Sequence, residues 1–208
     1  MLTLHHLETS RSSRIIWLLE ALDLPYELIT HKRGPDRRSM ADLKAIHPLG
    51  KAPALIDGDL LLVESGTILR YVADKYGSGR FQPPPGTAAH ARHDEWLDYA
   101  ESSLMGPVMM KLFGLMGGGL PEMLDGFASG ELTKAQAYVE AGVADTPFVM
   151  GDEVTLADMQ MSYCLAIMEA GGMLRDRAGL VAYWTRIQAH PGYQRAVEVG
   201  GPLVKLGG

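Results

Sequence analysis

The chain has 208 residues, of which 47% are hydrophobic and 21% are charged. This balance is that of an ordinary globular protein and excludes collagen-like, coiled-coil and largely disordered chains. At about 150 residues per domain, the length allows one large domain or two small ones. The 19 Lys and Arg residues against 25 Asp and Glu residues leave a net charge of -6, so we expect neither nucleic acid nor an anionic lipid surface as a partner.

The sequence carries no pattern of export or of membrane anchoring. No uncharged apolar stretch approaches the ~18 residues of a membrane span, and the amino terminus lacks the basic and apolar regions of a signal peptide. The single cysteine, Cys164, can form neither an intramolecular disulfide nor a CxxC motif. We therefore expect a cytoplasmic protein that makes no membrane contact and is stabilised by packing.

The amino-terminal part of the chain alternates strand and helix patterns. Residues 2–7 predict a short strand, and the apolar spacing of residues 15–22 predicts a helix that stops before Pro25. Residues 26–30 predict a second strand. Because a strand, a helix and a strand in succession form a right-handed parallel unit, we expect the two strands to be parallel.

A second group of elements follows a polar, basic stretch. A short helical piece is expected at residues 41–46, and residues 54–63 have the pattern of a hairpin that turns at an Asp-Gly pair. A helix begins directly after the hairpin and ends at Gly77. The side chains expected on its buried face are Ile68, Tyr71 or Val72, and Lys75. A hairpin beside a parallel pair predicts a mixed four-stranded sheet covered by helices.

A Pro-rich segment marks a boundary between two domains. Residues 81–86 cannot form regular structure, and the composition changes across them from strand-bearing to helical and Met-rich. Four stretches beyond it have helical patterns, namely 88–116, 133–144, 155–170 and 180–198. Gly106-Pro107 is expected to kink the first of them. We predict an α/β domain at residues 1–79, a linker at 80–87 and an all-α domain at 88–208.

Four sequence blocks, in a fixed order, resemble those of one protein family. They cover residues 10–20, 47–55, 63–69 and 151–158. Together with the helical domain that follows, they resemble the glutathione transferase family over nearly the whole chain. The pair Ser10-Arg11 makes the chain most similar to bacterial and fungal members, and it is less similar to the animal classes because no Tyr stands in the first strand.

The resemblance implies both a fold and an activity. The first domain would be thioredoxin-like, and the protein would be a cytosolic homodimer that acts in detoxification. The reaction would conjugate the thiolate of glutathione, a co-substrate, to small electrophiles, with glutathione-dependent peroxidase activity in addition. A non-catalytic binding or protein-association module of the same fold is the alternative. A thiol-dependent reductase would need a cysteine at the first strand–helix turn, where only Ser and Thr occur.

The first strand–helix turn is where the family resemblance places the thiol. A thiol with a pKa near ~8.5 is only slightly ionised at neutral pH, so the site must favour the thiolate with a hydroxyl and with helix amides. Alignment on Arg14 assigns the family's serine to Ser10, with Thr9 and Ser12 as alternatives. In a purely local interpretation, Ser10 or Ser12 only caps the helix. Arg11 is either a solvated charge or a contact to a glutathione carboxylate.

Two further blocks would bind the rest of the tripeptide. Pro53 matches the family's cis proline, which would turn the Ala52 backbone outward to pair with the ligand as an added strand does, whereas a trans proline would only form a turn. Lys51 would meet the glycyl carboxylate or remain a solvated lysine. Ser65 would bind the γ-glutamyl carboxylate at a helix start while Glu64 accepts from its ammonium group, although both residues also make good helix caps.

The helical half carries candidates of a different kind. Met105, Met109 and Phe113 are candidates for the pocket of the second substrate, or they pack in the helical core. Thr155 and Asp158 have the spacing of a capping box, and we assign them to folding. We expect no metal, because the histidines lack enough paired ligands. The sequence has no nucleophile elbow, dinucleotide or Walker motif, which disfavours hydrolases and nucleotide enzymes.

Overall fold

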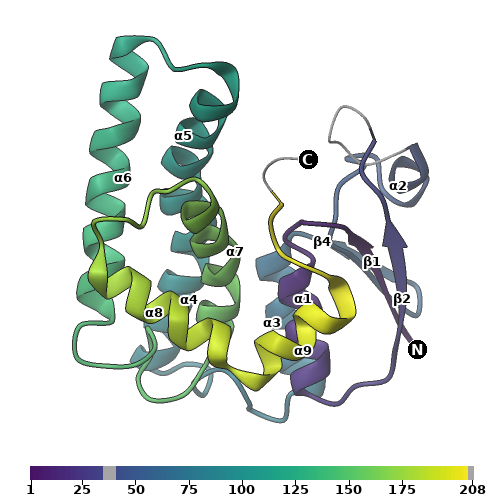
Figure 1. Cartoon of the computed structure of the whole chain (residues 1–208). Coiled ribbons are helices and arrows are strands. Elements are labelled where there is room, and N and C mark those ends of the chain that lie inside the picture. The colour runs from purple at the N-terminus through teal and green to yellow at the C-terminus, as the bar shows by residue number, and fades with distance from the viewer. Residues whose placement is uncertain (35–40, 206–208) are drawn as a thin grey trace. The chain divides into compact units, whose positions relative to one another are not determined.

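The computed structural model describes residues 1–34 and 41–205. The chain divides into two compact units, which can be followed along the sequence in Figure 1. The first unit contains residues 1–80 and 189–205, and the second contains residues 81–188. Residues 189–205 thus belong to the first unit, whereas the sequence predicts that they are part of a helical domain at 88–208.

The first unit contains all the strands of the described residues. Its elements are β1 (Leu2–Leu7), α1 (Ser13–Ala21), β2 (Tyr26–His31), α2 (Ala41–Ile46), β3 (Ala54–Asp57), β4 (Leu60–Val63), α3 (Ser65–Tyr76) and α9 (Pro191–Gly200). The order of strands and helices predicted up to α3 is confirmed.

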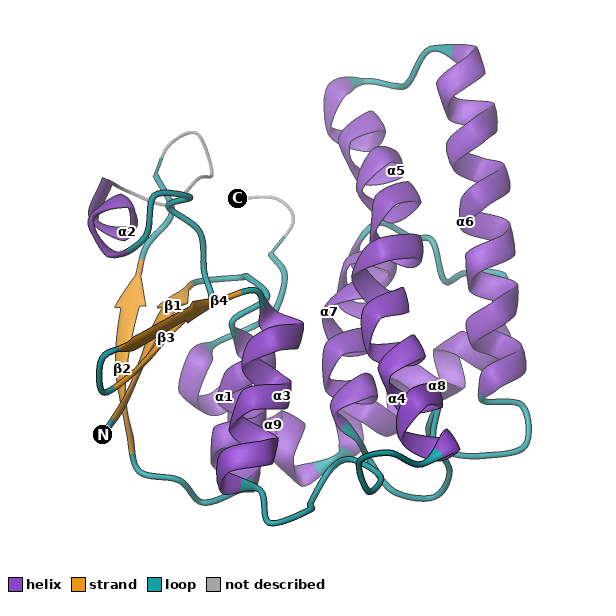
Figure 2. Cartoon of the chain, turned by 180° about the vertical axis from the view of Figure 1, so that it is seen from behind, coloured by secondary structure: helices purple, strands orange, loops and turns teal. Residues whose placement is uncertain are grey.

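The four strands form one sheet in the order β2-β1-β3-β4. β1 and β2 are parallel, whereas β3 is antiparallel to both β1 and β4, so the predicted mixed sheet is confirmed. Figure 2 shows α1, α3 and α9 gathered beside the sheet, and α1 packs against both other helices. Leu4, Ile15 and Ile68 are completely buried in this arrangement.

The return of the chain to the first unit follows from the composition of α1. Residues 15–19 are five apolar side chains in a row, and all of them are buried. A helix that is apolar on every side needs cover on every side. α9 provides part of that cover, with Tyr193 packed edge-on against the Trp17 ring at a centroid distance of 5.5 Å.

The second unit is helical throughout its regular elements. They are α4 (Ala88–Tyr99), η1 (Ala100–Leu104), α5 (Met105–Gly117), α6 (Glu122–Gly142), α7 (Leu156–Ala170) and α8 (Ala178–Ala189). α7 is the core helix, because every residue from Leu156 to Met168 is buried. No helix among the described residues is both long enough and apolar enough to cross a membrane.

The helices of the second unit depart from the predicted ranges where proline or packing intervenes. η1 is a π-helical turn that ends two residues before Gly106, close to the Gly106-Pro107 pair where the sequence predicts a kink. Pro107 has no N–H to donate to the carbonyl four residues earlier, and a wider turn absorbs that loss. α6 begins at Glu122 rather than at residue 133, because packing against α5 outweighs the low helix propensity of its glycines.

The predicted helix at 180–198 is in fact two helices. Pro191 ends the run because it cannot continue α8, and it then occupies the first turn of α9, where its missing N–H is harmless. In α3, the expected buried face holds for Ile68 and Val72. Lys75 was wrongly assigned to that face, since its side chain is 48% exposed and reaches the hairpin turn.

The hairpin turn is fastened to α3 through Asp57. Its carboxylate Oδ2 accepts from Lys75 Nζ at 2.6 Å, from the Tyr76 hydroxyl at 2.6 Å and from the Tyr71 hydroxyl at 2.7 Å. The ammonium group of Lys75, followed by the hydroxyls of Tyr76 and Tyr71, holds the pKa of Asp57 well below its ordinary value. The folded state is therefore stabilised by the ionised form of this carboxyl group.

We expect Asp57→Asn to lower the free energy of unfolding by about 2 kcal/mol at pH 7, because the bonds to a charged acceptor are lost. This difference from the wild type should shrink as the pH falls below ~4, where Asp57 becomes protonated in the unfolded chain and then in the folded one. Urea unfolding at pH 7 and pH 3 measures it. Asp59→Asn, at an exposed position in the same turn, is the control, and an equal effect of both variants would contradict the prediction.

The predicted capping box of α7 forms, and it is part of a larger buried cluster. Asp158 is fully buried and accepts from the backbone N–H groups of Thr155 at 2.8 Å and Val149 at 3.1 Å. The hydroxyl of Tyr183 in α8 donates to the same carboxylate at 2.7 Å. One side chain thus joins the start of α7 to the preceding loop and to α8.

Asp158→Ala should cost about 3 kcal/mol of unfolding free energy, because it leaves several buried donors without an acceptor. Thermal and urea unfolding of the purified variant measure this loss. Thr155→Ser keeps a hydroxyl at the cap and should stay near the wild type. An Asp158→Ala variant within about 0.5 kcal/mol of the wild type would show that the cluster contributes little.

Candidate functional site

Three turns meet at one end of the sheet. β3 runs antiparallel to β1 and begins at Ala54, which lies opposite His5 near the end of β1. β4 ends at Val63, which lies opposite Ala54 in turn. The register therefore brings together the three segments that the sequence analysis singled out: those after β1, before β3 and after β4.

The hydroxyl of Ser10 lies within the first of these turns. Ser10 is 5% exposed, and its Oγ is 2.6 Å from the Oγ of Ser12. Ser12 stands at the N-cap of α1, yet its hydroxyl does not cap the helix. The Ser12 hydroxyl turns back to β1, where it is 2.7 Å from His6 Nδ1 and accepts from the Leu7 N–H at 3.2 Å. The capping interpretation is therefore wrong for Ser12.

The amides at the start of α1 are used within the turn itself. The N–H groups of Ser13 and Arg14 donate to the carbonyls of Ser10 and Arg11, at 3.3 Å and 3.2 Å. The Ser12 N–H donates to Ser10 Oγ at 3.3 Å. An anion bound here would feel the field of the helix, but these three amides already have acceptors.

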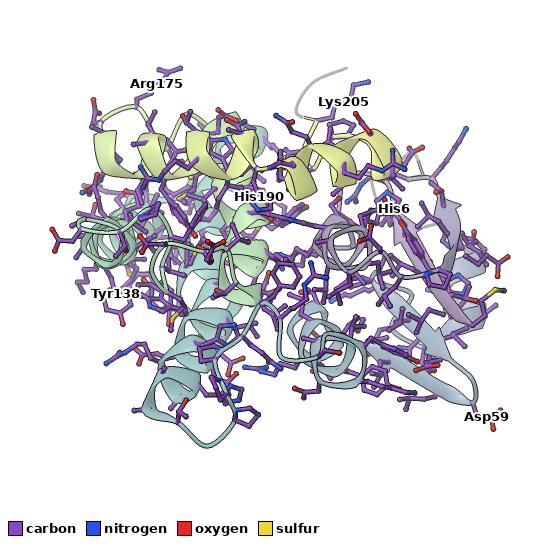
Figure 3. All side chains as sticks on the ribbon, turned by 90° about the horizontal axis from the view of Figure 1, so that it is seen from below. His6, Asp59, Tyr138, Arg175, His190 and Lys205 are labelled. Carbon is purple, nitrogen blue, oxygen red and sulfur yellow. The ribbon has the colours of Figure 1, made fainter. Side chains whose placement is uncertain are left out.

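His6 is the innermost member of the turn's polar network. It is completely buried, and its side chain, labelled in Figure 3, extends from β1 toward the end of α9, where Nε2 lies 2.9 Å from the carbonyl oxygen of Gly200. Because a carbonyl can only accept, Nε2 is the nitrogen that carries the proton. Burial lowers the pKa of His6, so the imidazole is neutral at pH 7 and Nδ1 holds a lone pair.

The neighbouring histidine belongs to a different network. Side chains alternate along a strand, so His5 points to the opposite face of the sheet from His6. Its Nδ1 is 3.0 Å from His31 Nε2, and His31 Nδ1 donates to the carboxylate of Asp42 in α2. Burial, and then the nearby His31, lower the pKa of His5.

Thr9 and Arg11, at the rim of the turn, differ in setting from Ser10. Thr9 has a positive φ of 52°. Its hydroxyl accepts from Arg33 Nε at 2.9 Å, and its carbonyl accepts from Arg33 Nη2 at 2.8 Å. Arg11 is half-buried. Thr9 is thus bound to the loop after β2, whereas Ser10 is bound to the interior of the unit.

The segment before β3 has the predicted backbone geometry. The peptide bond between Ala52 and Pro53 is cis, which confirms that prediction. Pro53 is buried, Ala52 is half-buried and Lys51 is exposed. The cis bond therefore joins a half-buried residue to a buried one, with an exposed cationic side chain before them.

The third turn joins a strained residue to a buried hydroxyl. Glu64 precedes α3 with a φ of 70°, which is uncommon for a residue with a side chain and is found preferentially at functional sites. Ser65 is buried, and its Oγ accepts from Nη1 of the buried Arg14 at 3.0 Å. Because Arg14 is the donor, Ser65 keeps its own proton for another acceptor.

The candidates for the second substrate share one face of α5. Met105, Met109 and Phe113 follow one another at intervals of four residues. Met105 is only 4% exposed, Met109 is half-buried and Phe113 is 59% exposed. Of the three, Phe113 therefore offers the most surface to a ligand.

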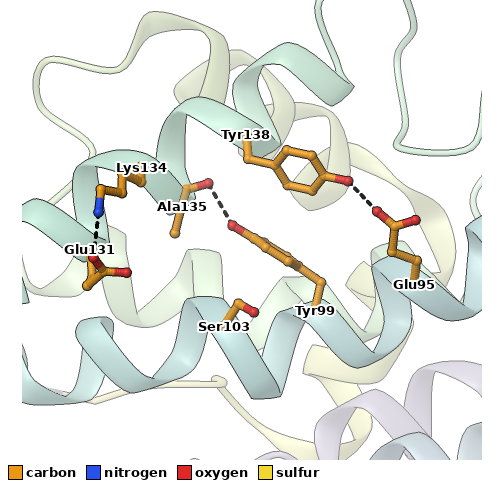
Figure 4. A pocket seen from close by; sticks show the side chains of 7 residues that line it. All are labelled: Glu95, Tyr99, Ser103, Glu131, Lys134, Ala135 and Tyr138. Carbon is orange, nitrogen blue, oxygen red and sulfur yellow. Dashed lines mark hydrogen bonds and ion pairs between the residues drawn. The ribbon is translucent and has the colours of Figure 1, made fainter.

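A hollow of about 450 Å³ in the second unit contains none of the predicted residues (Figure 4). Tyr99 and Tyr138 line it, and Figure 4 shows their hydroxyls bonded to the Ala135 carbonyl and to Glu95. Burial, and after it the electrostatic interaction with Tyr138 and Cys164, raises the pKa of the Tyr99 phenol to about 12. The hydrogen bond to Glu95 also raises the pKa of Tyr138. Both phenols therefore stay protonated at neutral pH.

Sequence reasoning missed three residues of the turn's network: His6, Arg14 as a contact, and Gly200. The available signals were a histidine at the end of a strand and an arginine within an apolar helix. No local pattern links Gly200 to them, because it lies at the other end of the chain. Within residues 1–34 and 41–205, no three His, Cys, Asp or Glu side chains gather as a metal site.

Comparison with known proteins agrees with this architecture. Residues 1–74 match the family described as "Glutathione S-transferase, N-terminal domain". Glutathione S-transferase 3 of Zea mays is 30% identical over 193 residues, which cover 88% of this chain and 87% of the relative. Glutathione S-transferase 3 of Schizosaccharomyces pombe is 29% identical over 207 residues, covering 90% and 82%. The crystal structure of a glutathione S-transferase from Actinobacillus pleuropneumoniae superposes with a TM-score of 0.87 at 32% identity, over 98% of this chain and 94% of that chain.

Proposed function

The chain belongs to the glutathione S-transferase family and is a glutathione transferase, and from this premise we propose how its own residues bind glutathione and hold its thiol. The observation that carries the proposal is the position of the Ser10 hydroxyl. This hydroxyl is nearly enclosed at the end of the sheet where the turns of Pro53 and Ser65 also lie. We assign the thiol of glutathione to Ser10 Oγ.

The choice of Ser10 over its rivals rests on their partners. Arg33 holds both the hydroxyl and the carbonyl of Thr9 toward the loop after β2, and the Ser12 hydroxyl faces His6 and the backbone of Leu7. Ser10 keeps one lone pair beyond its bonds within the turn. In this proposal, Ser12 acts on the thiol only through its hydrogen bond to Ser10.

The rest of the tripeptide is assigned to the other two turns. The backbone of the half-buried Ala52 pairs with the cysteinyl unit as an added strand would. The Ser65 hydroxyl, which has a proton to donate, binds the γ-glutamyl carboxylate at the start of α3. Glu64, exposed beside it, accepts from the ligand's ammonium group. Lys51 and Arg11 supply positive charge for the remaining carboxylate.

The reaction depends on the thiolate, which is the nucleophile. At pH 7, a thiol with a pKa of ~8.5 is about 3% ionised, and lowering that pKa by two units raises the ionised fraction to about 75%. Holding the thiolate beside an electrophile then makes the attack effectively unimolecular. We assign the contact with the electrophile to Met109 and Phe113. A homodimer and a cytoplasmic location, which the family resemblance implies, complete the proposal.

Ser65→Ala should weaken glutathione binding about tenfold, because a hydrogen bond to a carboxylate is lost. Calorimetric titration of glutathione measures this change. The pKa of the bound thiol, followed by ultraviolet absorbance of the thiolate, should stay at its wild-type value in this variant. An unchanged dissociation constant would remove Ser65 from the site.

Ser10→Ala should have the opposite profile. We expect the pKa of the bound thiol to rise by about one unit and turnover of an aryl halide electrophile to fall at least tenfold, with a smaller change in the dissociation constant. The pH dependence of turnover and of thiolate absorbance measures both. If Ser10→Ala and Ser65→Ala affected only binding, and to the same extent, the role assigned to Ser10 would be wrong.

A further inference from the structure

A continuous chain of buried hydrogen bonds runs from the end of α9 to the Ser10 hydroxyl. The Gly200 carbonyl is 2.9 Å from His6 Nε2, and His6 Nδ1 is 2.7 Å from Ser12 Oγ. Ser12 Oγ is in turn 2.6 Å from Ser10 Oγ. His6 and Ser12 are completely buried, so no solvent interrupts this chain.

The Gly200 carbonyl, at one end of this series of hydrogen bonds, sets the direction of the others. The Gly200 carbonyl must accept, which places the ring proton of the neutral His6 on Nε2. Nδ1 then has only a lone pair, and the Ser12 hydroxyl donates to it at 2.7 Å rather than to the Leu7 carbonyl, which is 3.4 Å away. Ser12 has a single hydroxyl proton, and the bond between the two serines is therefore donated by Ser10.

This direction limits what Ser10 can do in the resting protein. Its proton points at Ser12, so the Oγ atom presents a lone pair to a ligand. A lone pair can accept from a thiol S–H, but it cannot stabilise a thiolate. The hydroxyl becomes a donor to sulfur only when the whole chain reverses.

We propose that His6 takes up the thiol proton of glutathione through Ser12 and Ser10. The thiol proton passes to Ser10 Oγ, the Ser10 proton passes to Ser12 Oγ, and the Ser12 proton passes to His6 Nδ1. The electron pair of the S–H bond stays on sulfur, and the lone pair of Nδ1 forms the new N–H bond. Each serine loses one O–H bond and gains one, so the products are a thiolate and an imidazolium. This inference rests on the proposed function.

When these hydrogen bonds are reversed, each group that takes part in them still has a partner. Nδ1–H donates to Ser12, Ser12 donates to Ser10, and Ser10 donates to the thiolate. His6 Nε2 still donates to the carbonyl of Gly200, which is the last residue of α9. The carboxyl end of a helix carries the negative end of its dipole and favours a cation. His6 is a positioning residue, since it acts on sulfur only through the two hydroxyls.

The charges around His6 are few. Burial lowers its pKa most, the bond to Gly200 and the charge of Glu8 raise it, and His31 lowers it slightly. A thiolate at the far end of the chain adds a negative charge that favours the imidazolium. The histidine is therefore neutral before the thiol binds, and in the proposed relay it gains its proton together with the thiolate.

The number of protons released to solvent tests this relay directly. Glutathione is titrated into the protein at neutral pH by calorimetry, in two buffers of different ionisation enthalpy. The difference between the two binding enthalpies gives the number of protons released, and ultraviolet absorbance gives the amount of thiolate. With the relay, thiolate formation releases far fewer than one proton per site. In His6→Asn, whose amide oxygen can accept from Ser12 but cannot hold the proton, about one proton per thiolate should be released.

Two further variants make the test specific. Ser12→Ala interrupts the chain with His6 intact and should also release about one proton per thiolate. His5→Asn is the matched control, since the same substitution at the next residue of β1 alters the separate network with His31 and should keep the wild-type count. If His6→Asn does not fold, as judged by circular dichroism, the wild type and Ser12→Ala still decide the question.

The outcomes separate this inference from the proposed function. Saturable binding with a thiolate signal, but with about one proton released by the wild type as well, overturns the relay and leaves the transferase site intact. Equal counts in the wild type, His6→Asn and Ser12→Ala overturn it in the same way. No binding of glutathione at millimolar concentration overturns both proposals.

Discussion

The hydrogen bond between His6 and Gly200 joins the first strand of the chain to its last described helix. It forms only because α9 packs against α1 closely enough to bring a helix-terminal carbonyl to a buried imidazole. Gly200 permits this approach, since a Cβ atom at that position would lie 2.4 Å from Ile16 Cδ1. Without the carbonyl, the buried N–H of His6 would lack its acceptor, at a cost of about 1–3 kcal/mol.

The same constraint, that buried polar groups must find partners, organises the rest of each unit. In the first unit, Arg14 donates to Ser65 and so connects α1 to the start of α3. In the second unit, Asp158 takes up donors from the loop before α7 and from α8. These contacts stabilise the fold, and in the first unit they also set the direction in which the hydroxyl groups at the candidate site can donate.

Much of the fold and part of the candidate site could be predicted from the sequence. Strand and helix order followed from apolar periodicity, and the cis Ala52–Pro53 bond followed from a family resemblance carried by neighbouring motifs. The boundaries of α6 and the exposure of Lys75 could not be predicted, because packing against other elements decides them. The sequence leaves Ser12 as a possible cap, since nothing local indicates that its hydroxyl turns away from α1 toward His6.

The sequence by itself determined the family, the thioredoxin-like arrangement of the first unit and the three turns that hold the candidate residues. The family and its thioredoxin-like fold follow from a resemblance carried by short motifs, and the order of strands and helices follows from local periodicity; both signals act over a few residues. Only the tertiary structure decided which hydroxyl faces which partner, and which proton tautomer His6 adopts. Those properties depend on a bond to Gly200, 194 residues away in the chain, and a contact of that separation leaves no pattern in the local sequence.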